Sequence, residues 1–149
     1  MPPAYAVTDW SSLRMTLERQ RCIGSCPYYR VEIGGDGTVS YEGLDCVAMK
    51  GKQTGHVDDA EVKKLFQMFV SADFWSLQDQ YRGGEPDAPG YFVSLSFDGK
   101  SKRVLEYLRL SAGMPKIVQD IEDEIDRATA ISKWLWGTRD CSGRTIQDH

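Results

Sequence analysis

Four cysteines carry the most distinctive side-chain chemistry in this sequence. Cys22 and Cys26 are separated by three residues. Gly24 lies between them and Pro27 follows, which favours a turn over a helix or a central strand. On a turn, the two Cα atoms can approach the separation of about 5.5 Å that a disulfide requires. Four cysteines allow three complete pairings, and the sequence does not select one. We favour a structural bridge or no bridge, and keep a redox pair as the alternative, which requires exposure and a lowered thiol pKa.

A zinc site is the second chemistry that the cysteines allow. Cys46 and either His56 or Cys141 would complete four ligands with Cys22 and Cys26. The spacings match no zinc ribbon or finger, so we predict no metal and no cofactor. Cys141 is instead expected to be a free thiol in a loose tail.

The residues available for acid, base or nucleophilic catalysis are few. The two histidines are His56 and His149, and a serine or cysteine triad would depend on His56, which we interpret as a solvated loop residue. The carboxylates Asp79, Glu85 and Asp87 gather around one loop, where they would suit acid–base chemistry or an oxygen-ligand cation site. A solvated loop is the favoured interpretation. We therefore predict no catalytic residue and disfavour an enzyme.

Hydrophobic periodicity predicts the strands that position these residues. Apolar alternation indicates a first strand over 13–18 and a hairpin over 28–43. A second hairpin is expected over 91–108, turned at Asp98-Gly99. The polar, glycine-broken stretch before His56 is expected to be a further partner strand that frays or bulges. A loop is predicted over 78–90 because of its glycines and prolines.

Two helices are predicted between and after the hairpins. Asp58 is a suitable N-cap, and Glu61 three residues later completes a capping box. The apolar residues that follow at helical spacing are Val62, Leu65, Phe66, Phe69 and Val70. A second helix is expected over 115–136, starting at Pro115. The fold class is thus α+β, an antiparallel sheet of about five strands with two helices on one face, in the order ββ(β)α-ββα.

Length and composition predict one domain with an ordinary core. The chain has 149 residues, of which 41% are hydrophobic and 27% charged, and it can bury about two-thirds of its unfolded surface without disulfides. We assign residues 1–12 to an N-terminal arm, 13–137 to the domain and 138–149 to a C-terminal tail. A net charge of −4 disfavours nucleic acid as a partner, because phosphate neutralisation supplies much of that affinity.

The sequence as written also lacks targeting signals. A helix that spans a bilayer needs about 20 apolar residues, and no apolar run in the sequence is that long. The first residues also lack the pattern of a signal peptide. We expect a cytoplasmic protein. The alternative is an exported or periplasmic protein from which a signal peptide has been removed.

The first hairpin carries a motif that resembles a known family. Its residues are Cys22, Gly24, Cys26, Pro27 and Tyr29, followed by Asp36-Gly37-Thr38-Val39, Tyr41 and Gly43. They are similar to the C-x-G-x-C-P-x-Y … DGTVxYxG signature of the bacterial domain family DUF6438, and the likeness extends over roughly residues 13–136. That family is one of unknown function, so the resemblance implies a fold unit and no reaction.

The function that we favour is a non-enzymatic binding or protein-interaction module, with an unidentified protein or small molecule as its partner. Its working surface would be the sheet face left open by the helices, together with the loop over 78–90. Alternation along a strand does not say which face is exposed. The alternative is a thiol redox or metal-handling protein that uses Cys22 and Cys26. The candidate binding residues are Tyr28, Arg30, Tyr41, Asp79, Tyr81 and Asp87.

Overall fold

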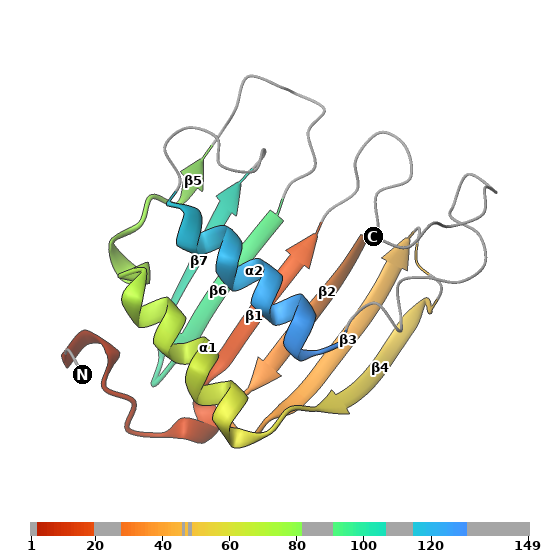
Figure 1. Ribbon diagram of the computed structural model, residues 1–149, viewed down its shortest axis with the longest axis horizontal. Helices are drawn as coiled ribbons and strands as arrows, with labels where there is room; N and C mark the ends of the chain where they lie inside the picture. Colours follow the sequence, from red (N-terminus) through yellow and green to blue (C-terminus); the bar gives the residue numbers. More distant parts are fainter. Residues whose placement is uncertain are drawn as a thin grey trace.

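A mixed sheet of seven strands forms one layer of the protein, and two α-helices form the other (Figure 1). The computed structural model describes residues 3–19, 28–45, 47, 49–81, 91–106 and 115–130. The spatial order of the strands is β4-β3-β2-β1-β6-β7-β5. The strands are β1 (Arg14–Arg19), β2 (Tyr28–Gly34), β3 (Thr38–Asp45), β4 (Gly51–His56), β5 (Gln80–Tyr81), β6 (Tyr91–Phe97) and β7 (Lys100–Glu106).

The predicted α+β class is confirmed, but the sheet is larger than expected and is not wholly antiparallel. The pair β5–β7 is parallel, whereas the other neighbouring pairs are antiparallel. The strand before His56 does not bulge, because β4 pairs regularly with β3 up to His56 opposite Thr38. The strand itself was predicted here, and only its regular pairing was not; an edge strand exposed to solvent needs no apolar alternation, so its polar sequence does not show how regularly it pairs. The additional strand β5 occupies two residues of the predicted loop.

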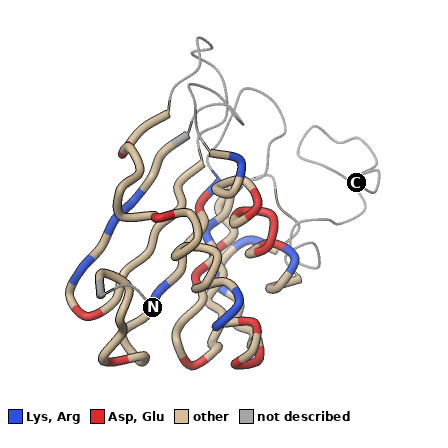
Figure 2. Tube along the Cα trace, turned by 60° about the vertical axis from the view of Figure 1, so that its left-hand side comes forward, with Lys and Arg blue, Asp and Glu red and all other residues tan. Residues whose placement is uncertain are grey.

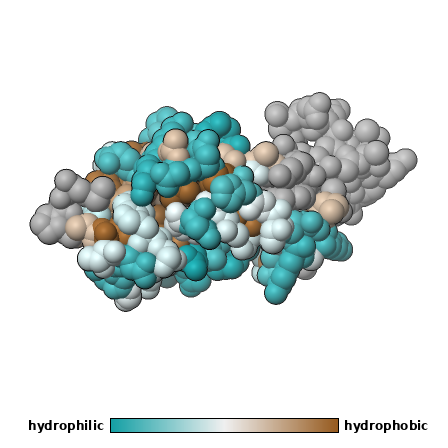
Figure 3. Space-filling view, turned by 90° about the horizontal axis from the view of Figure 1, so that it is seen from below, coloured by the Kyte–Doolittle hydropathy of each residue, from teal (hydrophilic) through white to brown (hydrophobic). Residues whose placement is uncertain are grey.

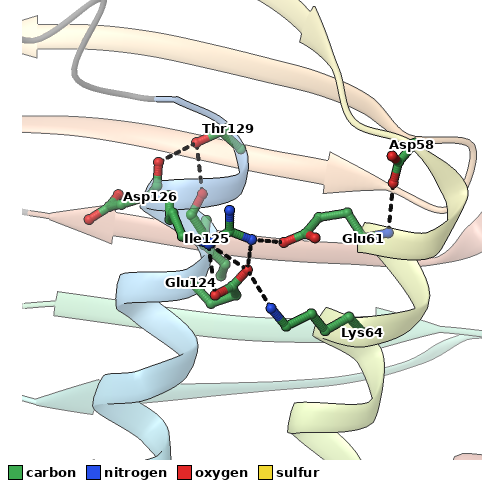
Figure 4. Close-up of polar contacts among 8 residues, drawn as sticks. Asp58, Glu61, Lys64, Glu124, Ile125, Asp126 and Thr129 are labelled. Carbon is green, nitrogen blue, oxygen red and sulfur yellow. Dashed lines mark hydrogen bonds and ion pairs between the residues drawn. The ribbon is translucent and has the colours of Figure 1, made fainter.

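The first helix, α1 (Asp59–Ser71), begins as predicted. The Asp58 carboxylate accepts a hydrogen bond from the backbone N–H of Glu61 at 2.9 Å (Figure 4). The Glu61 carboxylate does not complete the predicted capping box, because its Oε1 accepts a hydrogen bond from Arg127 on the second helix. The residues that α1 buries are Val62, Leu65, Phe66 and Phe69.

The second helix, α2 (Lys116–Ala128), is shorter than the predicted helix over 115–136. The Thr129 hydroxyl donates to the carbonyl oxygen of Ile125 at 2.8 Å, a bond that Figure 4 shows at the helix end. Ala130 then has φ of 50°, a left-handed conformation that does not continue an α-helix. The predicted extension beyond Thr129 is therefore wrong at this point, and residues 131–136 lie outside the described ranges.

The hydrophobic core lies between the sheet and the helices. Seen from below in Figure 3, hydrophobic residues show between hydrophilic outer surfaces. The N-terminal segment contributes to this core: the Tyr5 side chain is 3% exposed, and the Trp10 ring meets Phe66 edge-on at 5.3 Å. This segment runs so close to the first hairpin that a Cβ on Gly35 would lie 1.7 Å from the Trp10 carbonyl oxygen. Residues 3–12, expected as an irregular arm, contain two short 3-10 helices, Pro3–Tyr5 and Trp10–Ser12. A third, Phe74–Ser76, follows α1.

Neither helix, within the ranges that the structure describes, has the length and apolar composition needed to cross a membrane.

Candidate binding face

The candidate site is the sheet face that points away from α1 and α2, which we call the open face. Strand register defines it, because residues opposite each other in neighbouring strands share a face. One row across the sheet from β4 to β7 consists of Lys52, Glu42, Arg30, Glu18, Phe92 and Leu105. The next row consists of Thr54, Ser40, Glu32, Thr16, Ser94 and Arg103.

Glu32 on β2 organises the centre of the open face. Its Oε1 accepts hydrogen bonds from Thr16 Oγ1 at 3.3 Å and from Arg30 Nη2 at 3.4 Å. Its Oε2 lies 3.8 Å from Arg14 Nε. Ion pairs this exposed contribute at most about 1 kcal/mol each to stability, so their main effect is to orient the two arginines. The centre of the open face is thus a polar surface with defined side-chain positions.

Two shallow hollows lie on the open face and share Ser40. The first has a volume of about 240 Å³, the second about 290 Å³. In the first, the backbone N–H of Thr38 donates to Asp36 Oδ1 at 2.9 Å and lowers the pKa of that carboxyl group, which keeps it charged. The first hollow is lined by Ser11, Arg14, Glu32, Gly34, Asp36, Thr38 and Ser40. The second is lined by Arg30, Ser40, Tyr41, Glu42, Lys52, Gln53 and Thr54.

The three predicted binding residues on the first hairpin do not share one face. Arg30 is exposed on the open face, and Tyr28 is half-buried. Tyr41 is 2% exposed and stands opposite Val31 on the helix side of the sheet, so the expectation that it is displayed on the open face is wrong. Its hydroxyl donates to the Met49 carbonyl oxygen at 3.1 Å, and burial raises its pKa to about 12.

The predicted loop residues lie at the other edge of the sheet. Asp79 accepts a hydrogen bond from Lys102 Nζ at 2.9 Å, and its side chain is 84% exposed. Tyr81 is buried in β5, and its hydroxyl accepts a bond from the backbone N–H of Gln78. Strands β1, β6 and β7 separate β5 from Arg30 on β2, so the structure does not bring the two groups together.

Several predicted residues fall outside the described residues. They are Asp87 and the four cysteines, Cys22, Cys26, Cys46 and Cys141. Among the residues that are described, no group of three or more His, Cys, Asp or Glu side chains is placed to hold a metal ion.

A buried polar cluster on the helix side of the sheet was not predicted. Arg19 donates from Nη2 to Asp126 Oδ2 at 2.6 Å and from Nε to the Tyr29 hydroxyl at 2.8 Å. The Tyr29 hydroxyl donates to Asp126 Oδ1 at 2.7 Å, and the Arg19 guanidinium lies 4.6 Å from the centre of the Tyr91 ring. The cluster joins four elements, β1, β2, β6 and α2.

Charge compensation keeps this cluster ionic. Burial alone would lower the pKa of Arg19, but Tyr29 and Asp126 more than offset that effect and raise it. Burial, followed by the Asp126 charge, raises the pKa of Tyr29 well above its ordinary value. Sequence offers one signal for the cluster: Arg19 continues the buried alternation of Met15 and Leu17, where a charged residue needs a partner.

A second ionic network joins the two helices (Figure 4). Arg127 donates from Nη2 to Glu61 Oε1 at 2.6 Å and from Nε to both carboxylate oxygens of Glu124. Lys64 Nζ lies 3.4 Å from Glu124 Oε2. The hydrogen bonds from Arg127 lower the pKa of Glu124 to about 2. Contact with the Glu124 carboxylate, together with burial, raises the pKa of Glu61.

Replacing Glu124 by glutamine is expected to destabilise the protein in a pH-dependent manner. Because the folded-state pKa of Glu124 is depressed from 4.5 to about 2, its contribution is present above about 4.5 and is lost as pH falls toward 2. The raised pKa of Glu61 acts in the opposite direction, since its protonation favours the folded state as pH falls. Urea denaturation at neutral pH should show a loss of at most about 1 kcal/mol, because Arg127 is exposed. The difference between wild type and variant should shrink across that acidic window, and a constant difference would contradict the assignment.

A family model matches most of the chain. The family model described as a domain of unknown function (DUF6438) matches residues 13–129, a range that contains all the strands and both helices. No curated protein matches the chain.

Proposed function

The chain belongs to the DUF6438 family of domains of unknown function, and on that premise we propose that it is a non-enzymatic binding module that engages a protein through its open face. The observation that carries the proposal is the position of Ser40, where two polar hollows meet on a face that neither described helix covers. Because Glu32 holds Arg14 and Arg30 in place, this surface is ordered before a partner arrives, which lowers the entropic cost of binding.

The charges on the open face support a protein as the partner. Arg14 lines the first hollow beside Glu32 and Asp36, whereas Arg30 and Lys52 line the second with Glu42. Figure 2 shows basic and acidic residues interspersed along the described chain, in place of one extended area of a single sign. A protein surface with both signs of charge and many hydrogen-bonding groups complements this pattern better than a polyanion does.

The test begins with peptides selected from a random display library against the wild-type protein. Ser40→Trp places an indole where the two hollows meet, and it should weaken binding of the selected peptides by about tenfold or more. Gln67→Trp is the matched control, because Gln67 is exposed on α1 away from the sheet, and it should leave binding unchanged. Amide chemical shifts in the NMR spectrum should change on β1, β2 and β3 when peptide is added. Selected peptides that are insensitive to Ser40→Trp and that shift α1 and α2 would overturn the proposal.

The same assay distinguishes this proposal from the alternative of a thiol redox or metal-handling protein. A Cys22→Ser/Cys26→Ser double variant that remains folded should bind the selected peptides as the wild type does. Loss of binding in a folded double variant would favour a role for the two thiols.

A further inference from the structure

The outer edge of β4 lies beside the open face and forms one end of the sheet. Strand β4 has β3 as its neighbour on one side and forms the end of the sheet on the other. It pairs with β3 over all six of its residues without a register shift. The opposite edge of the sheet, β5, is two residues long. A long, regular edge strand presents a row of unpaired backbone groups.

The alternation of the ladder identifies the outward-pointing groups. Gly37 and Val57 stand opposite each other next to the pair Thr38 and His56. The backbone N–H of Val57 donates to the Gly37 carbonyl oxygen at 2.8 Å, so these two residues form a hydrogen-bonded pair of the ladder. In an antiparallel ladder every second pair exchanges hydrogen bonds, so the β4 residues bonded to β3 are Gly55, Gln53 and Gly51. The backbone groups that face outward belong to Lys52, Thr54 and His56. Within the described part of the chain, no hydrogen bond is made to these outward groups.

The edge also lacks the devices that normally prevent strand addition. Protected edges carry proline, bulges, inward-pointing charges or several lysines. Strand β4 contains two glycines, one lysine and no proline, and its pairing is unbulged. Within the described ranges, the backbone of β4 therefore presents no obstacle to pairing with another extended segment.

Side chains beside the edge define the chemistry of that segment. Lys52 is exposed and opposes Glu42 in register, yet no ion pair joins Lys52 to another described residue. Lys52 also lines the second hollow, and it belongs to the edge strand itself, so a carboxylate on an added strand would meet its ammonium group. Leu44 and Met49, exposed by 39% and 40%, lie at the end of the edge where β3 passes to β4 and offer apolar contact. We propose that an extended acidic peptide segment adds as a further strand beside β4, an inference that rests on the proposed binding function of the open face.

The probe is a fluorescein-labelled peptide of about eight residues, an ordinary strand length, in which glutamate alternates with valine and threonine. Fluorescence anisotropy should show saturable binding to wild type, and Lys52→Glu should weaken it about tenfold. Thr54→Pro removes an outward N–H without removing a bond to β3, and it should weaken binding by a similar factor. Thr54→Val keeps the N–H and is the matched control. Because proline also changes the backbone of the strand, a second probe N-methylated at alternate residues tests the same bonds on unaltered protein.

The outcomes distinguish failure of the β4 inference from failure of the proposed function of the open face. Equal binding of the methylated and unmethylated probes overturns strand addition, as does absence of binding by the acidic probe. If library-selected peptides still depend on Ser40 in that case, the open-face function stands and the β4 inference alone fails. A dimer in sedimentation that Thr54→Pro dissociates, without probe binding, would assign the edge to a second copy of the chain and overturn the peptide proposal.

Discussion

Replacing Asp126 by alanine is expected to lower the free energy of unfolding by about 3 to 5 kcal/mol, because it leaves a buried guanidinium without its counter-charge. The Arg19 side chain is 11% exposed, and its Nη2 lies 2.6 Å from Asp126 Oδ2. The Tyr29 hydroxyl, in a side chain that is 1% exposed, loses its acceptor in the same variant. Urea denaturation followed by circular dichroism measures the loss.

Asp120→Ala is the matched control for this prediction. Asp120 is on the same helix, but its pair with Lys116 is exposed, so its removal should cost at most about 0.5 kcal/mol. A triple variant, Arg19→Met/Tyr29→Phe/Asp126→Leu, should recover much of the loss, since it also removes the buried hydroxyl and apolar residues can replace a buried ion pair at little cost. Similar small losses in Asp126→Ala and Asp120→Ala would show that the buried cluster is not a stabilising contact.

Phe66→Ala is expected to cost about 3 to 5 kcal/mol, the range for removing a buried aromatic ring. The Phe66 side chain is 1% exposed and meets two rings edge-on, Trp10 at 5.3 Å and Phe97 at 5.6 Å. Its removal opens a cavity among α1, the sheet and the N-terminal segment. Urea denaturation should show the loss, and tryptophan fluorescence should show increased solvent access.

The neighbouring Gln67→Ala variant provides the reference for Phe66. Gln67 is exposed on α1, so this variant should remain within about 0.5 kcal/mol of wild type. A loss of less than about 1 kcal/mol for Phe66→Ala would mean that the site collapses around the missing ring, contrary to a tightly packed core.

Elements with strong local patterns were predictable from the sequence. The start of α1 at Asp58 and the turn at Asp98-Gly99 each depend on residues close together in the chain. By contrast, β4 was expected to fray or bulge, because a strand with solvent on its outer side needs no apolar alternation and its polar sequence does not indicate regular pairing. The end of α2 was not predictable, because the left-handed φ of Ala130 stops the helix although the apolar spacing of the sequence continues.

The candidate site was predictable only in outline. Alternation predicts two faces of the sheet, but which face Arg30 and Tyr41 occupy depends on where the helices pack. The partnership of Arg19 with Asp126 joins a strand to a distant helix, so no local spacing could reveal it. Asp79 and Tyr81 were grouped with the hairpin residues, and the strand order separates them.

The central position of β1 sets the order in which this sheet can be completed. Strand β1 pairs with β2 on one side and with β6 on the other, and β6 follows the first helix in the chain. The β1–β2 contacts are local and can form early, whereas the β1–β6 contacts require a long chain segment to close. During synthesis on the ribosome, β1 therefore keeps one unpaired edge until β6 has been made. The folding rate of the whole domain should accordingly depend on the docking of β6, and a fragment that stops before it would expose an aggregation-prone strand.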